Sequence, residues 1–237
     1  MTYSEAVASA PPGAATFNGE DLERLPPDVL DRFLEAVPAD ELALFRTGDT
    51  AVSRRVLRAA FWTLVYHLLP ERWDELSRAE PIHPGVLAAL PADGARILEV
   101  GAGSGRLTVN LAPRARMLIA VEPSAPLRQI LLVRVPGVAV LDAVAQELPV
   151  VDGWADLTAS CASLGPDPAC VSELVRCTRP GGTIALVSPE NPDWFEAHGW
   201  RRLSFEVAEV VIPRHNPGLE EFFGPLMPPH ELFLRTA

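Results

Sequence analysis

Acidic residues stand in or directly after three short apolar runs of this 237-residue chain. Glu99 lies inside the first run, Glu122 follows the second, and Asp142 follows the third. Runs of this length are typical of buried parallel strands. Ligands of an open parallel sheet bind beyond the carboxyl ends of its strands, so we expect these carboxylates to meet one ligand there.

Glycine occupies alternate positions directly after the first run. Gly101, Gly103 and Gly105 separate that run from a helical pattern that begins at Leu107. The spacing predicts a strand-to-helix turn, where glycine adopts backbone angles that a Cβ forbids and lets a ligand approach the peptide closely. We expect free amides at the start of the helix to face that ligand.

The acid before the turn distinguishes two kinds of ligand. Nicotinamide and flavin enzymes use G-x-G-x-x-G, with a pyrophosphate at the helix N-terminus. Here the spacing is G-x-G-x-G, and Glu99 precedes it. A carboxylate suits a cationic group and suits a pyrophosphate badly, so the pattern favours a ligand that carries a cationic group. A glycine-rich turn without any ligand is the remaining alternative.

The stretch Glu-Val-Gly-Ala-Gly-Ser-Gly-Arg at residues 99–106 resembles the first motif of class I S-adenosylmethionine (SAM)-dependent methyltransferases. The resemblance covers about residues 82–237. It implies SAM as the cofactor and Glu99 as the partner of its ammonium, helped by a backbone carbonyl near Ser160. The cofactor-binding residues that it implies are Glu99, Gly101, Ala102, Gly103, Gly105, Glu122, Pro123, Asp142, Ala143 and Ser160.

The resemblance also assigns separate roles to the two acids that follow strands. Glu122 lies twenty-one positions after Gly101 and would accept hydrogen bonds from both ribose hydroxyls, although it could instead cap the helix that starts at Ser124. Asp142 would accept from the adenine amine while the amide of Ala143 donates to the ring, although Asp142 could instead be a solvated loop acid.

Strands and helices alternate from residue 95 onward, which predicts a parallel sheet with right-handed crossovers. The expected strands cover 97–100, 117–121, 138–141, 154–161 and 183–187, and the expected helices follow Ser124 and cover 168–177. Two terminal stretches, 200–212 and 231–236, are expected to form a hairpin at the sheet edge. The family resemblance implies an α/β, doubly wound sheet of seven mostly parallel strands, with an antiparallel last strand.

The chain before the sheet reads as helical, and we predict two domains. Residues 1–90 form a helical appendage, with a long helix at 50–69 and a short one at 84–90. Its first twenty residues, rich in Ala, Pro, Ser and Gly, are expected to be mobile. Residues 91–237 form the SAM-binding domain.

Composition limits the partners. The formal net charge of −11 disfavours nucleic acid, because phosphate neutralisation needs clustered cations. Three cysteines without a C-x-x-C pair predict no metal site. We see no leader peptide and no apolar run long enough to span a membrane, so we expect a cytoplasmic protein, monomeric or homodimeric, that does not bind membranes.

Methyl transfer from a sulfonium is an in-line displacement, so alignment matters most and a base is optional. Tyr66, His67 and His83 are the candidate catalytic residues, and His83 is the nearest of them to the first strand. The aromatic residues Phe61, Trp62, Tyr66 and Trp73 fit a helical lid over an apolar small molecule, although such residues more often form a core.

The leading hypothesis is therefore a methyltransferase that acts on the oxygen, nitrogen or carbon of a small organic acceptor, in secondary metabolism. One alternative is a SAM-binding enzyme that catalyses cyclisation or decarboxylation without giving up the methyl group. Another is a methyltransferase-like scaffold that binds a partner and has lost its chemistry. The intact set of glycines and acids argues against the scaffold.

Overall fold

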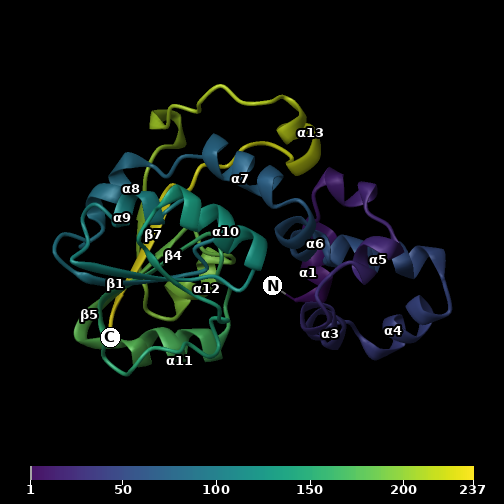
Figure 1. The fold of residues 1–237 in the computed structure, drawn as a ribbon, viewed down its shortest axis with the longest axis horizontal. Coiled ribbons are helices and arrows are strands. Elements are labelled where there is room, and N and C mark those ends of the chain that lie inside the picture. The colour runs from purple at the N-terminus through teal and green to yellow at the C-terminus, as the bar shows by residue number, and fades with distance from the viewer. Residues whose placement is uncertain (1) are drawn as a thin grey trace. The chain divides into compact units, whose positions relative to one another are not determined.

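The computed structural model describes residues 2–237, which fold into two compact units (Figure 1). The first unit comprises the chain up to Leu76 together with His215–Leu226, and the second comprises Ser77–Arg214 and Met227–Ala237. The division between Leu76 and Ser77 falls within helix α7 (Pro70–Ala79). No helix among residues 2–237 is long and apolar enough to cross a membrane.

The second unit is built on a seven-stranded sheet with the strand order β3-β2-β1-β4-β5-β7-β6. Its strands are β1 (Arg96–Val100), β2 (Met117–Val121), β3 (Ala139–Leu141), β4 (Ala155–Cys161), β5 (Thr178–Val187), β6 (Arg201–Ser204) and β7 (Glu231–Thr236). Strands β1 to β5 pair in parallel, whereas β7 runs antiparallel to both β5 and β6. The predicted α/β fold with a mostly parallel seven-stranded sheet is confirmed.

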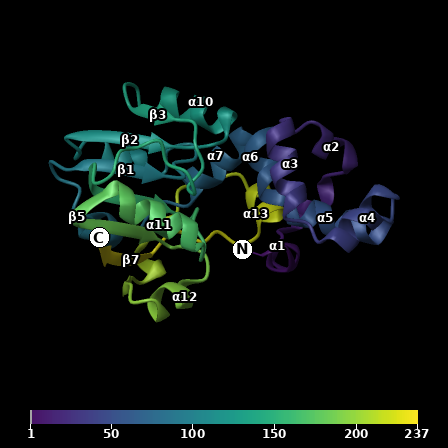
Figure 2. The same ribbon diagram turned by 90° about the horizontal axis from the view of Figure 1, so that it is seen from below.

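Helices cover both faces of this sheet (Figures 1 and 2). Those on one face are α8 (Pro84–Ala89), α9 (Thr108–Leu111) and α10 (Ala125–Arg134), and those on the other are α11 (Pro168–Cys177) and α12 (Pro192–Ala197). Because side chains alternate along a strand, Ile97 packs with α8 and α9 while its neighbour Leu98 packs with α11. Both residues are fully buried, so the sheet carries a core on each side.

The first unit is helical. Its elements are α1 (Tyr3–Ser9), η1 (Pro12–Thr16), α2 (Gly19–Glu23), α3 (Pro27–Glu35), α4 (Ala39–Arg46), α5 (Thr50–Ala59), α6 (Phe61–Leu68), the first part of α7, and α13 (Gly218–Phe223). Val56 and Leu64 lie in one buried cluster, and Phe61, Val65 and Phe222 lie in a second. Helix α13, distant in sequence, is therefore held by aromatic packing.

The N-terminal part of this unit differs from our expectation in two ways. Residues 3–16, expected to be mobile, form α1 and η1, while Met1 lies outside the described residues. Thr2 and Glu5 form a reciprocal capping box, and Gly13 packs so closely on the Phe222 ring that a Cβ would lie 2.5 Å from it. The single helix predicted at 50–69 is also wrong, because the chain breaks at Ala60 between α5 and α6.

The C-terminal part of the chain also departs from the prediction. Strand β6 ends at Ser204, well before residue 212, because its partner β7 begins only at Glu231 and is preceded by Pro228 and Pro229, which have no amide to donate. Residues 207–209 form the 3-10 helix η2 instead. Helices α12 and α13 were not predicted, and β5 begins at Thr178, before the expected strand at 183–187, beside a shift in strand register.

The compact units also divide the chain elsewhere than between residues 90 and 91. Val86 of α8 is fully buried in the cluster that contains Ile97, so α8 belongs to the sheet unit. The segment 215–226, which we assigned to the SAM-binding domain, belongs to the helical unit through Phe222.

Candidate functional site

The glycine turn after β1 is closely packed on both sides. Gly101 has a φ of +71°, and a Cβ there would lie 2.3 Å from the Ser163 hydroxyl oxygen. Gly105 has a φ of +98°, and a Cβ there would lie 2.8 Å from Leu131 of α10. Only glycine combines these left-handed angles with such close neighbours, so the turn has the character that the spacing predicts.

The amides of this turn are mostly engaged within the protein. Gly101 and Ala102 donate to the carbonyl of Val121 at 2.9 and 3.0 Å, and Gly105 donates to the carbonyl of Ala102 at 2.9 Å. Helix α9 begins only at Thr108, several residues beyond the turn. The amides of Gly101, Ala102 and Gly105 are therefore not free, and the expectation that amides at the start of the following helix face a ligand stays a prediction.

Glu122 joins the end of β2 to the glycine turn. Its side chain is 6% exposed, and it accepts hydrogen bonds from the amides of Gly103 and Ser124, both at 2.8 Å. Burial raises the pKa of Glu122, while the two amides oppose the rise. The Ser124 contact matches the helix-start alternative, but each carboxylate oxygen keeps a lone pair for a further donor. Its role toward ribose stays a prediction.

Glu99 is the most isolated acid of the site. It is 1% exposed on β1, and its Oε2 atom has no hydrogen-bond partner among residues 2–237. Burial raises the pKa of Glu99 to about 8, and the nearby Glu122 carboxylate adds to the rise, while Thr108 opposes it. A buried polar atom without a partner is costly, so a ligand that brings a cationic donor would be stabilised here.

Asp142 follows β3 and is already paired. Its side chain is 68% exposed, and its Oδ2 accepts from Arg128 at 2.7 Å. The same guanidinium donates to the carbonyls of Glu122 and Pro123 at 2.7 and 2.8 Å. Arg128, which we did not single out from the sequence, thus ties the loops after β2 and β3 together. The adjacent Ala143 is half-buried against the sheet core. The assignment of these residues to adenine stays a prediction.

Ser160 lies at the end of β4, the strand beside β1. Its buried hydroxyl lies 2.6 Å from that of Ser163, which donates to the Val100 carbonyl at 3.3 Å. Between them Ala162 has a φ of +50°, an unfavourable angle for a residue with a Cβ. Ser163 therefore covers Gly101, and sequence reasoning missed it because the contact is non-local.

His83 is the N-cap of α8. Its Nδ1 accepts from the amide of Gly85 at 2.9 Å, and its Nε2 lies 3.3 Å from a carboxylate oxygen of Glu209. The ring is buried and stacked on Phe205. The Nδ1 hydrogen bond and the Phe205 ring hold His83 in place, which gives it a capping function, while its buried Nε2 atom makes no hydrogen bond among residues 2–237. Its use as a base stays a prediction.

Tyr66 and His67 lie on α6 in the helical unit. The Tyr66 ring packs against Trp62 and Trp73, with ring centroids 6.0 and 4.9 Å apart. Trp62 also stacks on Phe223, at 5.9 Å and 9° between the ring planes. The aromatic residues that we singled out thus form one cluster, joined by α13. Their catalytic roles stay predictions.

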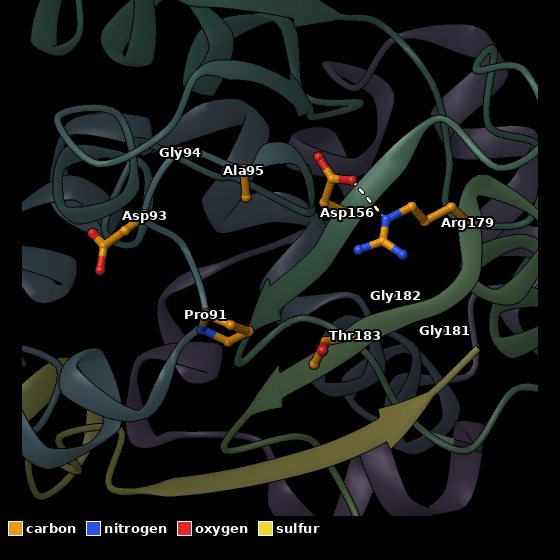
Figure 3. Close-up of a pocket in the computed structure, with 9 residues that line it drawn as sticks. All are labelled: Pro91, Asp93, Gly94, Ala95, Asp156, Arg179, Gly181, Gly182 and Thr183. Atoms are coloured by element: carbon orange, nitrogen blue, oxygen red, sulfur yellow. Dashed lines mark hydrogen bonds and ion pairs between the residues drawn. The ribbon is translucent and has the colours of Figure 1, made fainter.

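A depression of about 310 Å³ lies at the amino ends of the strands, at the edge of the sheet opposite the glycine turn (Figure 3). It is lined by Pro91, Asp93, Gly94, Ala95, Asp156, Arg179, Gly181, Gly182 and Thr183, from the amino ends of β1 and β4 and the bulged start of β5. Arg179 donates to Asp156 at 2.7 Å, and the amide and side chain of Arg96 donate to it as well. These contacts hold the pKa of Asp156 below its usual range. The depression is thus separate from the acids at the carboxyl edge.

Other reactive groups do not gather into a metal site. Among the residues that the structure describes, no three His, Cys, Asp or Glu side chains lie close enough together to hold a metal ion. Burial raises the pKa of the Cys161 thiol to about 12, so this thiol stays protonated near neutral pH.

Comparison with known proteins places the glycine turn in a described family. Residues 97–182, which extend from β1 into β5, match a family described as a methyltransferase domain. The chain is 33% identical over 138 residues to an uncharacterised methyltransferase of Mycobacterium tuberculosis, covering 56% of this chain and 54% of the relative. A demethylmenaquinone methyltransferase of Beutenbergia cavernae is 30% identical over 109 residues, covering 44% and 45%.

The chain thus spans about half the length of these curated relatives. Among solved structures, a SAM-dependent methyltransferase from Aquifex aeolicus is 18% identical with a TM-score of 0.48, covering 57% of this chain and 88% of that one.

Proposed function

We propose that this chain, whose residues 97–182 match a methyltransferase domain, is a class I SAM-dependent methyltransferase that transfers a methyl group from SAM to a small organic acceptor. The observation that carries the proposal is the Oε2 atom of Glu99, buried without a partner beside the glycine turn. A ligand ammonium would satisfy that atom, whereas a pyrophosphate would add negative charge next to it.

The residues around the turn fit the rest of the cofactor. Glu122 stands at the end of β2 with both oxygens able to accept further hydrogen bonds, as two ribose hydroxyls require. Asp142 stands at the end of the neighbouring β3, where it would face the adenine amine with the oxygen that Arg128 does not hold. When bound, SAM supplies an activated methyl group on its sulfonium. The protein's part is to align the acceptor with that group and to exclude water.

The acceptor is proposed to be an apolar small molecule bound with the help of the helical unit. The half-buried rings of Trp62, Tyr66, Trp73 and Phe223 support this, because flat aromatic surfaces favour flat apolar ligands. The relative from Beutenbergia cavernae, whose name gives demethylmenaquinone as its acceptor, is consistent with such a class. The net charge of −11 supports an enzyme that does not act on nucleic acid.

The test is transfer of isotope-labelled methyl groups from SAM to a panel of small phenols, amines and polyketides. Label in the acceptor, with S-adenosylhomocysteine as co-product, is the expected result. Glu99→Gln should lose most of this activity, while Asp152→Asn, which alters an 81% exposed acid bound to Arg176, should not. Conversion of an acceptor without labelling would indicate the cyclase or decarboxylase alternative and would contradict the proposal.

A further inference from the structure

A buried ion pair lies directly behind the glycine turn. Arg106 follows Gly105, and its Nη2 atom lies 3.2 Å from Oε2 of Glu80, with each side chain 11% exposed. Burial raises the pKa of Glu80, while the charge of Arg106 opposes the rise. Desolvating two charges offsets much of their attraction, so such a pair contributes little to stability by itself. What it does provide is a defined geometry for the residues that carry the charges.

The other oxygen of Glu80 reaches a different part of the chain. Its Oε1 accepts from the amide of Met227 at 2.8 Å. Three residues before Glu80, the hydroxyl of Ser77 lies 3.3 Å from that of Ser104, and both serines are buried. The segment 77–80 therefore contacts the glycine turn at two alternate residues, Ser104 and Arg106, and also holds the chain at Met227.

These contacts lie where the chain passes into the sheet unit. Ser77 is the first residue of that unit after the helical segment, and Met227 is the first after the segment 215–226. At the first of these positions Ser77 contacts Ser104 of the turn. At the second, Met227 donates to the carboxylate of Glu80, which also holds Arg106. The side chain of Glu80 thus contacts both the amide of Met227 and the guanidinium of Arg106 in the turn.

The pair also lies close to the acid that we assign to the cofactor. The charges of Arg106, Glu99 and Glu80 all act on the thiol of Cys161, at the end of β4. All three groups are therefore near enough to this thiol to influence its pKa. A shift of Arg106 would move the backbone of the turn that begins two residues after Glu99.

We propose that Glu80 is a positioning residue for the cofactor: by holding Arg106 it keeps the glycine turn in the shape that binds SAM. This inference rests on the proposed function, since it concerns affinity for the same cofactor. Glu80 touches neither the cofactor nor the acceptor in this account. Its effect passes through the guanidinium of Arg106 and the backbone of residues 101–106.

The test is the dissociation constant for SAM in Glu80→Gln, measured by titration calorimetry. Glutamine keeps an oxygen for the Met227 amide but removes the charge that holds Arg106. We expect SAM to bind about tenfold more weakly, since a buried charge loses its partner. The apparent KM for SAM should rise similarly, while kcat at saturating SAM stays within about twofold of the wild-type value. Asp93→Asn is the control, because it breaks an ion pair with Arg114 whose carboxylate is 81% exposed at the other edge of the sheet, and it should leave SAM affinity unchanged.

Two further variants keep the inference testable. Glu80→Gln combined with Arg106→Gln should weaken SAM binding by less than the product of the single effects, because both changes remove the same interaction. If Glu80→Gln fails to fold, Ser77→Ala should still weaken SAM binding while its circular dichroism remains native. Wild-type affinity in a folded Glu80→Gln protein, or in Ser77→Ala where that variant is needed, would overturn the inference. Absence of SAM binding by the wild-type protein would instead contradict the proposed function.

Discussion

The carboxylate of Glu122 accepts a hydrogen bond from the amide of Gly103 at 2.8 Å, and this bond connects the end of β2 to the turn that follows β1. Its second oxygen holds the Ser124 amide at the start of α10 at the same distance. One buried acid therefore shapes two segments that we assign to the cofactor site. Its substitution should affect both ligand binding and folding.

Glu122→Ala is expected to weaken SAM binding by roughly 1.5–3 kcal/mol, the usual loss for hydrogen bonds to a charged group. It should also lower the melting temperature by several degrees, because two buried amides lose their acceptor. Glu122→Gln keeps one acceptor oxygen, so its SAM affinity and melting temperature should lie between those of the wild-type and Glu122→Ala proteins. Calorimetry and thermal unfolding measure the two effects. Unchanged SAM affinity in a destabilised Glu122→Ala protein would reduce the acid to a helix cap.

Asp142→Ala should have a smaller effect than Glu122→Ala. The Asp142 side chain is mostly exposed, so loss of its pair with Arg128 should cost less than about 1 kcal/mol of stability. SAM affinity should fall modestly and should recover in Asp142→Asn, which keeps an acceptor oxygen for the adenine amine. Equal affinity in the alanine, asparagine and wild-type proteins would show that Asp142 is a loop acid without a ligand.

Gly101→Ala should abolish SAM binding. The added Cβ would lie 2.3 Å from the Ser163 hydroxyl, in a residue whose φ of +71° already disfavours side chains. Combining it with Ser163→Gly should remove the clash and restore part of the folding stability, while a strain of about 1–2 kcal/mol from the backbone angle persists. Gly94→Ala is a suitable control, because Gly94 has a positive φ without a neighbour near its Cβ position. If Gly101→Ala bound SAM normally, the close packing of the turn would have no functional meaning.

The pH dependence of SAM binding should reveal the titration of Glu99. In the free protein the pKa of Glu99 is about 8, above its ordinary value, and a bound ammonium favours the charged form and lowers that pKa. Affinity should therefore increase as the pH rises toward 8 and fall above it, since an α-amino group loses its proton near pH 7.7–8.0. Below pH 8, binding should release a proton, which calorimetry in buffers of different ionisation enthalpy detects.

The titration of Glu99 also determines how the free energy of unfolding changes with pH. A folded-state pKa above the unfolded value gives stability that is present at low pH and is lost as the pH rises through about 8. Glu99→Gln should remove the proton release and the rising limb below pH 8, leaving only the ligand's own titration. A rising limb that persisted in this variant would contradict the assignment of Glu99.

Residues of the helical unit should affect the acceptor more than the cofactor. Substitutions at Tyr66 and Trp73 should lower turnover or change acceptor preference, while the free energy of SAM binding moves by less than about 1 kcal/mol. His83→Ala should lower the free energy of unfolding, because His83 caps α8 through a hydrogen bond from Gly85. Loss of a catalytic base alone would lower turnover without this loss of stability. Unchanged turnover in all three variants would direct the search for acceptor contacts to the loops after β4 and β5.

Local signals explain which parts of the fold were predictable. The helix Pro168–Cys177 was predicted with its observed bounds, because Asp167 caps it and proline opens it. Strand β2 was likewise predicted from its apolar run and the acid that follows. By contrast, the break at Ala60 carries no glycine or proline, and the length of β6 depends on where a strand thirty residues away begins.

The candidate site likewise contains features that local sequence signals indicate and contacts that they do not. The sequence placed Glu99 and Glu122 at the carboxyl ends of two strands, and the structure pairs these strands side by side in parallel, while the roles of the two acids stay predictions. The contacts of Ser163 with Gly101, and of Glu80 with Arg106, join loops that are distant in sequence. Such pairings follow from packing and leave no periodic trace in the sequence.

The most direct test of the central claim is titration calorimetry of the wild-type protein with SAM, S-adenosylhomocysteine and NAD, alongside Glu99→Gln. We predict micromolar binding of SAM and S-adenosylhomocysteine, no measurable binding of NAD, and much weaker SAM binding in the variant. Binding of NAD more tightly than SAM, or equal SAM affinity in the Glu99→Gln protein, would contradict the account.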